Sequence, residues 1–179
     1  MAVNMQDTDF LWVFGYGSLM WRPGFPFVER QRAQLFGYHR SLCVFSHVHR
    51  GTPERPGLVL GLDRGGRCHG VAFRVAPEEA AATVHYLRER EQATAVYLER
   101  QLPVRLVDGQ RITALAYVVD RKHPQYAGRL SFEETVDLVR RGEGISGRNP
   151  DYVRSTHEHL IGMGVVDPLL ERLTGAVES

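Results

Sequence analysis

In the segment Leu11-Trp12-Val13-Phe14-Gly15-Tyr16-Gly17-Ser18-Leu19, residues 11–16 form a short apolar and aromatic run that ends abruptly at Gly17 and Ser18. Such a run, bounded by turn residues, predicts a buried strand followed by a tight turn. The turn glycines expose backbone N–H groups, which could form an oxyanion hole or an anion-binding nest, although an ordinary strand-end turn explains the same residues. Three known loops do not fit. Met20 stands where a Rossmann fingerprint needs glycine, no Gly-Lys-Ser/Thr follows, and Ser18 lacks the flanking pattern of a nucleophile elbow.

Outward from this segment, the first two-thirds of the chain consist mainly of strand-like runs. The further predicted strands are residues 34–45, 58–63, 69–75, 97–107 and 111–119. Asp108-Gly109 joins the last two and favours a type I′ hairpin turn. The segment from Arg50 to Gly57 holds two prolines and two glycines, which is loop composition, and it could close over a substrate.

Helix signals stand between and after the strands. The predicted starts are Pro77 followed by two glutamates, the capping box Ser131 with Glu134, Asn149-Pro150-Asp151, and Asp167-Pro168. Strands and helices without regular alternation predict an α+β fold, a mixed β-barrel or curled sheet with flanking helices. At 179 residues we expect a single domain over residues 1–179, with residues 1–9 as a flexible N-terminal tail.

Composition excludes several classes of function. The 22 basic side chains nearly balance the 21 acidic ones, so we expect no nucleic-acid partner and no anionic membrane surface. No apolar run approaches the length of a membrane span, and residues 1–9 lack the features of a signal peptide. The two cysteines, Cys43 and Cys68, stand alone, which argues against a disulfide framework. Together these features predict a cytoplasmic protein.

The helix predicted after Pro77 carries a carboxylate on its apolar face. Its stripe consists of Ala80, Val84 and Leu87, at positions i, i+4 and i+7. Glu91 continues that stripe at i+11, at or near the helix end. The pattern therefore predicts a glutamate that faces inward.

Two interpretations of Glu91 remain open. It could pair with an arginine such as Arg88 or Arg90, or lie in water beyond a helix that ends early. Alternatively it is a partly desolvated general base, because burial raises the pKa of a carboxyl toward neutrality. Periodicity does not decide between them.

Metal and thiol chemistry have little support. The pairs His47/His49 and His157/His159 have i, i+2 spacing, which places two side chains on opposite sides of a strand and aligns them poorly on a helix. No third ligand stands at a suitable spacing, so we expect no metal site. Both cysteines lie in strand-like stretches, where buried structural thiols are common.

Several blocks of the chain match one known family. Tyr16-Gly17-Ser18-Leu19 is followed by Trp21 and Pro23, and Arg90-Glu91 ends a helix. The matching blocks are residues 13–23, 49–53 with 56–57, 69–74, 86–91 and 146–152. In this order, over nearly the whole chain, they resemble the ChaC-type, glutathione-specific gamma-glutamylcyclotransferases.

The resemblance implies the corresponding fold, a lyase activity that converts glutathione into 5-oxoproline and cysteinylglycine, and no cofactor. It implies that Glu91 is the catalytic acid/base. It also implies that the substrate is held by the following residues: Tyr16, Gly17, Ser18, Leu19 and Tyr152, with Arg22 as a further candidate for a substrate carboxylate. Neither the sequence nor the resemblance predicts the oligomeric state.

One departure concerns the exit from the catalytic helix. The family often has glycine soon after Arg-Glu and then an aromatic residue, whereas this chain has Gln92-Ala93-Thr94-Ala95-Val96-Tyr97. This difference leaves Glu91 in place but bears on substrate preference. The alternatives are therefore a cyclotransferase acting on other gamma-glutamyl amino acids or amines, and a non-catalytic gamma-glutamyl-binding module. A serine hydrolase has no visible elbow or triad order.

Overall fold

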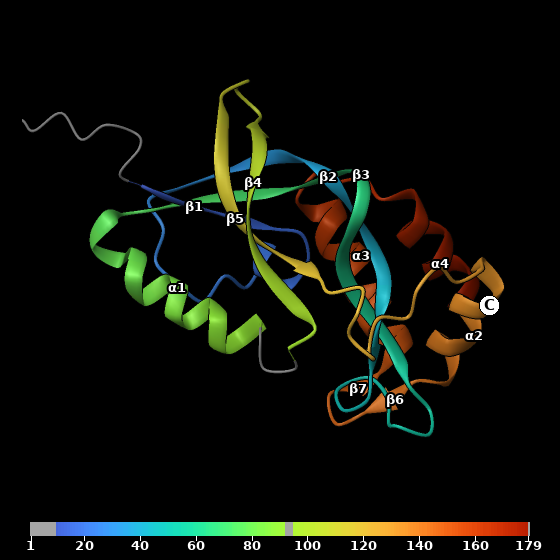
Figure 1. Ribbon diagram of the computed structural model, residues 1–179. Coiled ribbons are helices and arrows are strands. Elements are labelled where there is room, and N and C mark those ends of the chain that lie inside the picture. The colour runs from blue at the N-terminus through green and yellow to red at the C-terminus, as the bar shows by residue number, and fades with distance from the viewer. Residues whose placement is uncertain (1–9, 92–94, 179) are drawn as a thin grey trace, which may run out of the picture. The chain divides into compact units, whose positions relative to one another are not determined.

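A computed structural model describes residues 10–91 and 95–178 (Figure 1). The elements in chain order are β1 (Leu11–Gly15), the short 3₁₀ turn η2 (Ser18–Met20), β2 (Glu29–Ser46), β3 (Gly57–Val75), α1 (Pro77–Glu91), β4 (Tyr97–Leu106), β5 (Arg111–Val119), α2 (Phe132–Arg141), β6 (Glu143–Gly144), β7 (Gly147–Arg148), α3 (Asn149–Gly162) and α4 (Pro168–Glu178). The predicted α+β class is confirmed. None of the helices in the described ranges combines the length and apolar character needed to cross a bilayer.

The main sheet is a closed barrel with the strand order β1-β3-β2-β4-β5. The apolar run of β1 lies between β3, with which it pairs antiparallel, and β5, with which it pairs parallel. In that register Leu11 lies opposite Val75, and Val13 lies opposite both Phe73 and Leu115. With strands on both sides, β1 is buried from Trp12 onward, as its nearly continuous apolar sequence requires.

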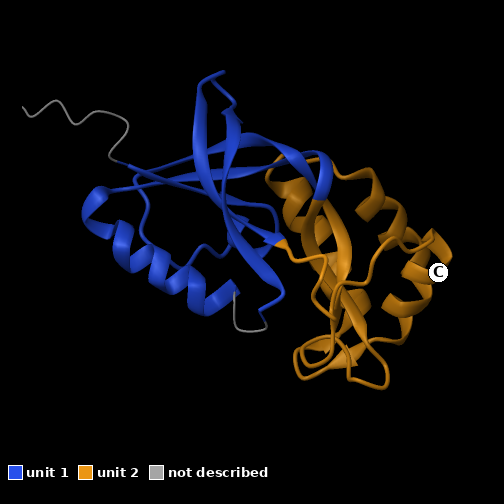
Figure 2. Ribbon diagram, viewed as in Figure 1, with its two compact units in different colours: residues 1–39, 64–118 blue, residues 40–63, 119–179 orange. Residues whose placement is uncertain are grey.

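The described chain forms two compact units (Figure 2), and each is described by itself. Unit 1 comprises residues 1–39 and 64–118, and unit 2 comprises residues 40–63 and 119–179. The chain passes between units within β2, within β3 and at the end of β5. Residues 1–9 lie outside the described residues, so the tail and the single domain over residues 1–179 stay predictions.

Unit 1 contains β1, η2, α1 and the β4–β5 hairpin (Figure 1). An aromatic group packs the segment after η2 onto α1. The Phe25 ring meets Phe73 edge-on at 5.6 Å and Tyr86 of α1 at 6.4 Å. Gly24 takes φ +76°, and a side chain there would collide with the Tyr86 hydroxyl. This contact fixes the segment that follows η2 against the catalytic-helix candidate.

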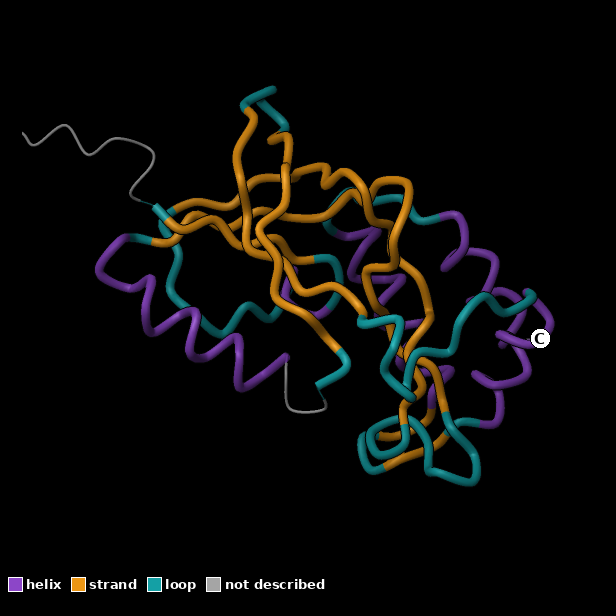
Figure 3. Tube along the Cα trace, in the orientation of Figure 1, coloured by secondary structure: helices purple, strands orange, loops and turns teal. Residues whose placement is uncertain are grey.

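Unit 2 contains α2, α3 and α4, which pack on one another (purple in Figure 3). The predicted capping box is present, because Ser131 accepts from the Glu134 N–H while Glu134 accepts from the Ser131 N–H. Helix α3 begins at Asn149 and α4 at Pro168, as their start signals predict. Arg40 of β2 and Asp167 form an ion pair of 3.2 Å just before α4.

Three local predictions are wrong. The strand predicted at 34–45 begins five residues earlier, at Glu29, because charged residues alternate with covered ones there and conceal the strand pattern. The strands predicted at 58–63 and 69–75 are one continuous strand. Gly65 and Gly66 carry it through the polar segment with φ values of +104° and +70°, which only glycine adopts readily.

The third wrong prediction is the type I′ turn between β4 and β5. That turn needs positive φ at both central residues, and Gly109 has φ +94° whereas Asp108 has a negative φ. The Gly109 N–H donates to the Leu106 carbonyl at 2.9 Å, and the Leu106 N–H donates to the Gln110 carbonyl at 2.8 Å. These bonds define a three-residue loop in which Gly109 supplies the left-handed position.

Candidate active site

Helix α1 places Glu91 at its last residue, with its side chain turned toward the interior of unit 1. Leu87 is fully buried one turn earlier, and Ala80 and Val84 are partly covered, so the predicted stripe faces inward. The helix also buries Thr83, a polar residue that the stripe does not include. Only 17% of the Glu91 side chain is exposed, which excludes a helix that ends early and leaves Glu91 in water.

Two opposing effects act on the Glu91 carboxyl. Burial raises its pKa, because removing water disfavours the charged form, and the charge of Arg90 lowers the pKa. Burial is the larger of the two. Arg90 Nε lies 3.6 Å from Glu91 Oε1, so both open interpretations hold in part: Glu91 is ion-paired and it is also desolvated. A carboxyl with a raised pKa can exchange protons closer to neutral pH than an ordinary one.

Arg90 connects the end of α1 to the segment after β1. Its Nη2 donates to Ser18 Oγ at 2.9 Å. Its Nη1 donates to the backbone carbonyls of Arg22, at 2.6 Å, and Pro23, at 3.2 Å. The same nitrogen lies 3.0 Å from the Tyr86 hydroxyl. One guanidinium therefore holds the Glu91 helix against the loop that carries the predicted substrate-binding residues.

The loop after β1 is a compact turn. Tyr16 and Leu19 are buried, whereas Ser18 is exposed at the surface of the turn. The Met20 N–H donates to the Gly17 carbonyl at 2.9 Å, and the Arg22 N–H donates to the Ser18 carbonyl at 2.7 Å. Since Ser18 and Leu19 open a helical turn, their own N–H groups have no earlier carbonyl of that turn to bond. Such groups can receive a negative charge.

The structure brings together only part of the predicted set. Ser18 and the backbone of Arg22 meet at Arg90, next to Glu91. The Arg22 side chain itself is exposed. Tyr152 belongs to unit 2, where it occupies the first turn of α3 and its hydroxyl accepts from the Leu60 N–H at 3.0 Å. Its place relative to the unit 1 residues stays a prediction.

The segment predicted as a loop from Arg50 to Gly57 is a loop up to Pro56, and Gly57 already begins β3. The Arg50 guanidinium lies over the Tyr152 ring at 5.5 Å from its centre and donates to the Arg148 carbonyl at 3.2 Å. The N–H of Thr52 donates to the Arg55 carbonyl at 3.0 Å, which closes a tight turn inside the segment. The positions Gln92 to Thr94, where the chain departs from the family, lie outside the described residues.

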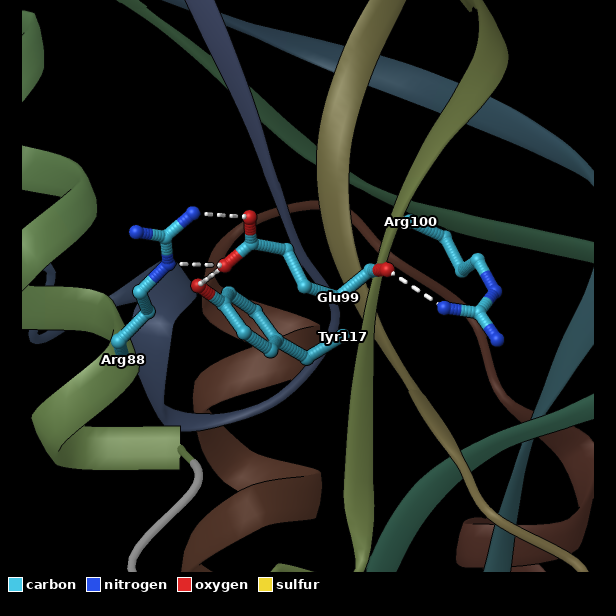
Figure 4. A network of polar contacts seen from close by, with 4 residues as sticks. All are labelled: Arg88, Glu99, Arg100 and Tyr117. Atoms are coloured by element: carbon cyan, nitrogen blue, oxygen red, sulfur yellow. Dashed lines mark hydrogen bonds and ion pairs between the residues drawn. The ribbon is translucent and has the colours of Figure 1, made fainter.

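The last turn of α1 also contacts β4 and β5 (Figure 4). Arg88 holds Glu99 of β4 with two bonds, Nε to Oε2 at 2.9 Å and Nη2 to Oε1 at 3.0 Å. The hydroxyl of Tyr117, on β5, donates to Glu99 Oε2 at 2.9 Å. The bond from Arg88 holds the pKa of Glu99 below its usual value, so Glu99 is an anion at neutral pH.

Within the described ranges no group of three or more His, Cys, Asp or Glu side chains is arranged to hold a metal ion. One histidine of each i, i+2 pair has a local hydrogen-bond partner. His49 Nδ1 lies 2.8 Å from Ser146 Oγ, and His159 Nδ1 lies 2.7 Å from the Ser155 carbonyl oxygen. Their ring nitrogens thus take part in local hydrogen bonds of unit 2.

The cysteines have the character of structural thiols. Cys43 and Cys68 are both buried, and neither forms a disulfide. Burial, with a further contribution from the charge of Asp63, raises the pKa of Cys43 to about 12. Because the thiolate is the nucleophilic form of cysteine, Cys43 is unreactive at neutral pH.

Sequence reasoning missed the roles of Arg90 and Glu99. From the sequence Arg90 is expected only as an ion-pair partner of Glu91, because its partners in the loop after β1 are 67 to 72 residues away in the chain. The sequence does contain a signal for Arg90, because Arg90 directly precedes Glu91 in the Arg-Glu pair. Glu99 had no comparable signal, since it lies in a strand with alternating polar residues.

Comparisons with known proteins give a consistent result. A family model described as ChaC-like protein matches residues 11–179. The Escherichia coli (strain K12) protein named glutathione-specific gamma-glutamylcyclotransferase is 35% identical over 172 residues, covering 96% of this chain and 74% of that protein. The rat protein named glutathione-specific gamma-glutamylcyclotransferase 1 is 33% identical over 179 residues, and the alignment covers 97% of this chain and 81% of that protein.

A solved structure shares the fold. A crystal structure described as a gamma-glutamyl cyclotransferase specific to glutathione, from yeast, superposes with a TM-score of 0.83. The alignment covers 94% of this chain and 96% of that chain, at 23% sequence identity.

Proposed function

This chain belongs to the ChaC-like family, and we propose that it is a glutathione-specific gamma-glutamylcyclotransferase that converts glutathione into 5-oxoproline and cysteinylglycine. The observation that carries this proposal is Glu91, a buried carboxyl with a raised pKa at the end of α1, joined through Arg90 to the Ser18 loop. The names of the relatives supply the substrate.

The reaction is an intramolecular transfer. The α-amine of the gamma-glutamyl group attacks its own γ-carbonyl carbon, a five-membered lactam forms, and the bond to the cysteinyl nitrogen breaks. Both reacting groups belong to one molecule, so the enzyme must fold the glutamyl chain rather than bring two reactants together. An α-amine has a pKa of about 8, and at neutral pH most of it is an unreactive ammonium.

Glu91 supplies the proton transfers. As a carboxylate it takes one proton from the α-ammonium, and as an acid it gives that proton to the cysteinyl nitrogen while the C–N bond breaks. The lactam nitrogen then loses its second proton to solvent and the released amine takes one up, so protons balance over one cycle. The raised pKa suits this task because a nearly neutral pKa makes both transfers easier. Arg90, 3.6 Å away, limits the rise so that the carboxylate form stays available.

The remaining predicted residues hold the substrate. Backbone N–H groups of the segment from Tyr16 to Leu19 stabilise the oxyanion that forms on the γ-carbonyl, and one such donor typically contributes about 3–4 kcal/mol. Tyr152 contributes its hydroxyl, and the exposed guanidinium of Arg22 pairs with a substrate carboxylate. Every step uses protein groups and substrate atoms, and we expect turnover without added metal or organic cofactor.

The test is incubation of the purified protein with reduced glutathione, without added metal, followed by mass spectrometry of the products. We expect 5-oxoproline and cysteinylglycine in equal amounts. Gamma-glutamyl dipeptides that lack the C-terminal glycine, tested in parallel, distinguish a broader gamma-glutamyl specificity. Binding of glutathione without products, in a folded protein, would identify a binding module and overturn the proposal.

A matched pair of variants tests the role of Glu91. Glu91→Gln should fold normally and lose about 10²- to 10⁴-fold in kcat, the usual contribution of an acid/base group. Glu89→Gln is the control, because Glu89 lies on the same helix but is exposed and pairs only along the helix, with His85 at 3.2 Å. Near-normal turnover by Glu91→Gln would reject the assignment.

We also propose a cytoplasmic location. The balanced charge and the two isolated cysteines support it, and neither cysteine forms a disulfide, as is usual in a reducing compartment. Localisation of a tagged chain by microscopy or cell fractionation tests this.

A further inference from the structure

The last turn of α1 is held on its outer side by a single acidic residue of β4. Arg88 precedes Glu91 by one helical turn, so the two side chains are neighbours on the helix surface. The fork of Arg88 binds both oxygens of Glu99, at 2.9 and 3.0 Å (Figure 4). A two-point contact of this kind fixes orientation as well as distance.

Glu99 also receives a bond from the interior. Tyr117 is almost completely buried on β5, and its hydroxyl donates to Glu99 Oε2 at 2.9 Å. Burial and the Glu99 bond raise the pKa of Tyr117, and the charge of Glu91 raises it further. The phenol therefore stays neutral and keeps its proton for Glu99, and it lies close enough to Glu91 to respond to its charge.

We propose that Glu99 is a positioning residue for the cyclotransferase reaction, which holds Glu91 in its desolvated place by binding Arg88 on one side and Tyr117 on the other. The inference rests on the proposed function of Glu91. Arg88–Glu99 joins α1 to β4, and Tyr117–Glu99 joins β4 to β5, so one carboxylate fixes the end of the helix to two strands of the barrel.

The ion pair between His85 and Glu89 of α1 differs from the Arg88–Glu99 pair in one respect that matters for Glu91. His85 and Glu89 lie on the same helix face, and both are largely exposed. That pair joins two residues of one helix and so cannot fix the helix to a strand. Ion pairs at the surface contribute little to stability. Loss of the Arg88–Glu99 pair should therefore alter the position of Glu91 much more than the melting temperature.

The experiment compares four variants: Glu99→Gln, Arg88→Met, Tyr117→Phe and the control Glu89→Gln. We expect the first three to lower kcat about tenfold, with KM changed less than about twofold, since small displacements of a reacting group cost large factors in rate. The control should match the wild type. Glu99→Gln and Arg88→Met replace groups at least partly exposed, so both should fold even if Tyr117→Phe does not.

The pH dependence separates positioning from simple charge effects. Among the charged or titratable groups near Glu91 in the described part of unit 1, Arg90 on the same helix lowers its pKa, and the phenol of Tyr117 on β5 responds to the Glu91 charge. Arg88 lies one helical turn before Glu91 and pairs with Glu99 of β4. If the helix end loosens, water reaches Glu91, its pKa falls, and the acid limb of kcat/KM moves to lower pH. Removing the positive charge of Arg88 would by itself move that limb to higher pH.

Arg88→Met is therefore decisive. An acid limb at lower pH in both Arg88→Met and Glu99→Gln supports positioning. A limb at higher pH, or an unchanged one, in Arg88→Met overturns it, as does wild-type kcat in Glu99→Gln.

A second readout does not depend on turnover. Carbon-13 NMR titration of the Glu91 carboxyl, assigned with Glu91→Gln, should give a lower pKa in Glu99→Gln and Arg88→Met than in wild type. If wild-type protein does not cleave glutathione, the proposed function fails, and this titration still decides whether Glu99 positions Glu91.

Discussion

Replacement of Arg90 by methionine removes the link between the Glu91 helix and the Ser18 loop. Methionine has a similar reach but offers no donors and no charge. The Nη1 of Arg90 has two protons for three acceptors, Arg22 O, Pro23 O and the Tyr86 hydroxyl, while Nη2 serves Ser18. Three independent bonds are therefore lost, rather than four.

The cost in stability follows from these bonds. A hydrogen bond from a charged group contributes about 1.5–3 kcal/mol when it is buried. One-fifth of the Arg90 side chain is exposed and its acceptors can rehydrate in part, so we expect a loss of about 2–3 kcal/mol. For a protein of this size that corresponds to a melting temperature lower by about 5–10 °C.

The effect on catalysis has a defined sign. The charge of Arg90 lowers the pKa of Glu91, so its removal leaves burial unopposed and raises that pKa further. We expect the acid limb of kcat/KM to move to higher pH in Arg90→Met, and kcat to fall about a hundredfold because the loop loses its anchor. Arg90→Lys keeps the charge but not the planar fork, so it should lose rate without moving the limb.

The assays are pH–rate profiles with glutathione from acidic to neutral pH and thermal melts of the same preparations. An Arg90→Met protein with the wild-type profile and melting temperature would refute the reasoning. A limb that moves to lower pH would show that the loop contacts, and not the charge, control Glu91.

Three further changes have definite expected outcomes. Gly24→Ala places a side chain against the Tyr86 hydroxyl at φ +76°, and we expect it to destabilise the protein by at least about 1–2 kcal/mol in urea titrations. Asn149→Ala leaves the buried N–H and carbonyl of Leu58 without the side-chain partners now at 2.8 and 2.9 Å, which should cost about 2–5 kcal/mol by the same measurement. For Glu91→Gln, the melting temperature of the variant minus that of wild type should increase as the pH rises. The raised pKa of Glu91 means that the folded state binds more protons than the unfolded state between the two pKa values, so wild-type stability falls as pH rises through that window, and glutamine has no such loss.

How much was predictable depends on the range of the interaction. The inward direction of Glu91 follows from local helix periodicity, and the starts of α2, α3 and α4 follow from caps within a few residues. Glu99 could not be identified, because its partners are 11 and 18 residues away and it is one of several charged residues on a polar strand. The role of Glu99 depends on contacts between residues distant in the chain, and such contacts cannot be recognised from a single sequence.

The turn and strand errors have the same origin. Asp108-Gly109 is compatible with a two-residue turn, but the register of β4 and β5 selects a three-residue loop instead. The polar start of β2 continues the strand because the Arg32 carbonyl accepts from the Val107 N–H at 3.0 Å and Ala33 pairs with Leu106 of β4, backbone partners that composition does not reveal. Local propensity was overridden in both places by pairing.

The side chain of Asn149 also bears on how unit 2 avoids pairing with the strand of another protein molecule. Its amide binds both backbone groups of Leu58, and the Tyr152 hydroxyl accepts from Leu60, two residues along the same side of β3. These are the groups through which an unprotected strand edge recruits another chain. Side chains at the start of α3 thus occupy the positions of a missing neighbouring strand. Damage at Asn149 should consequently be seen as aggregation on heating, before any loss of chemistry at Glu91.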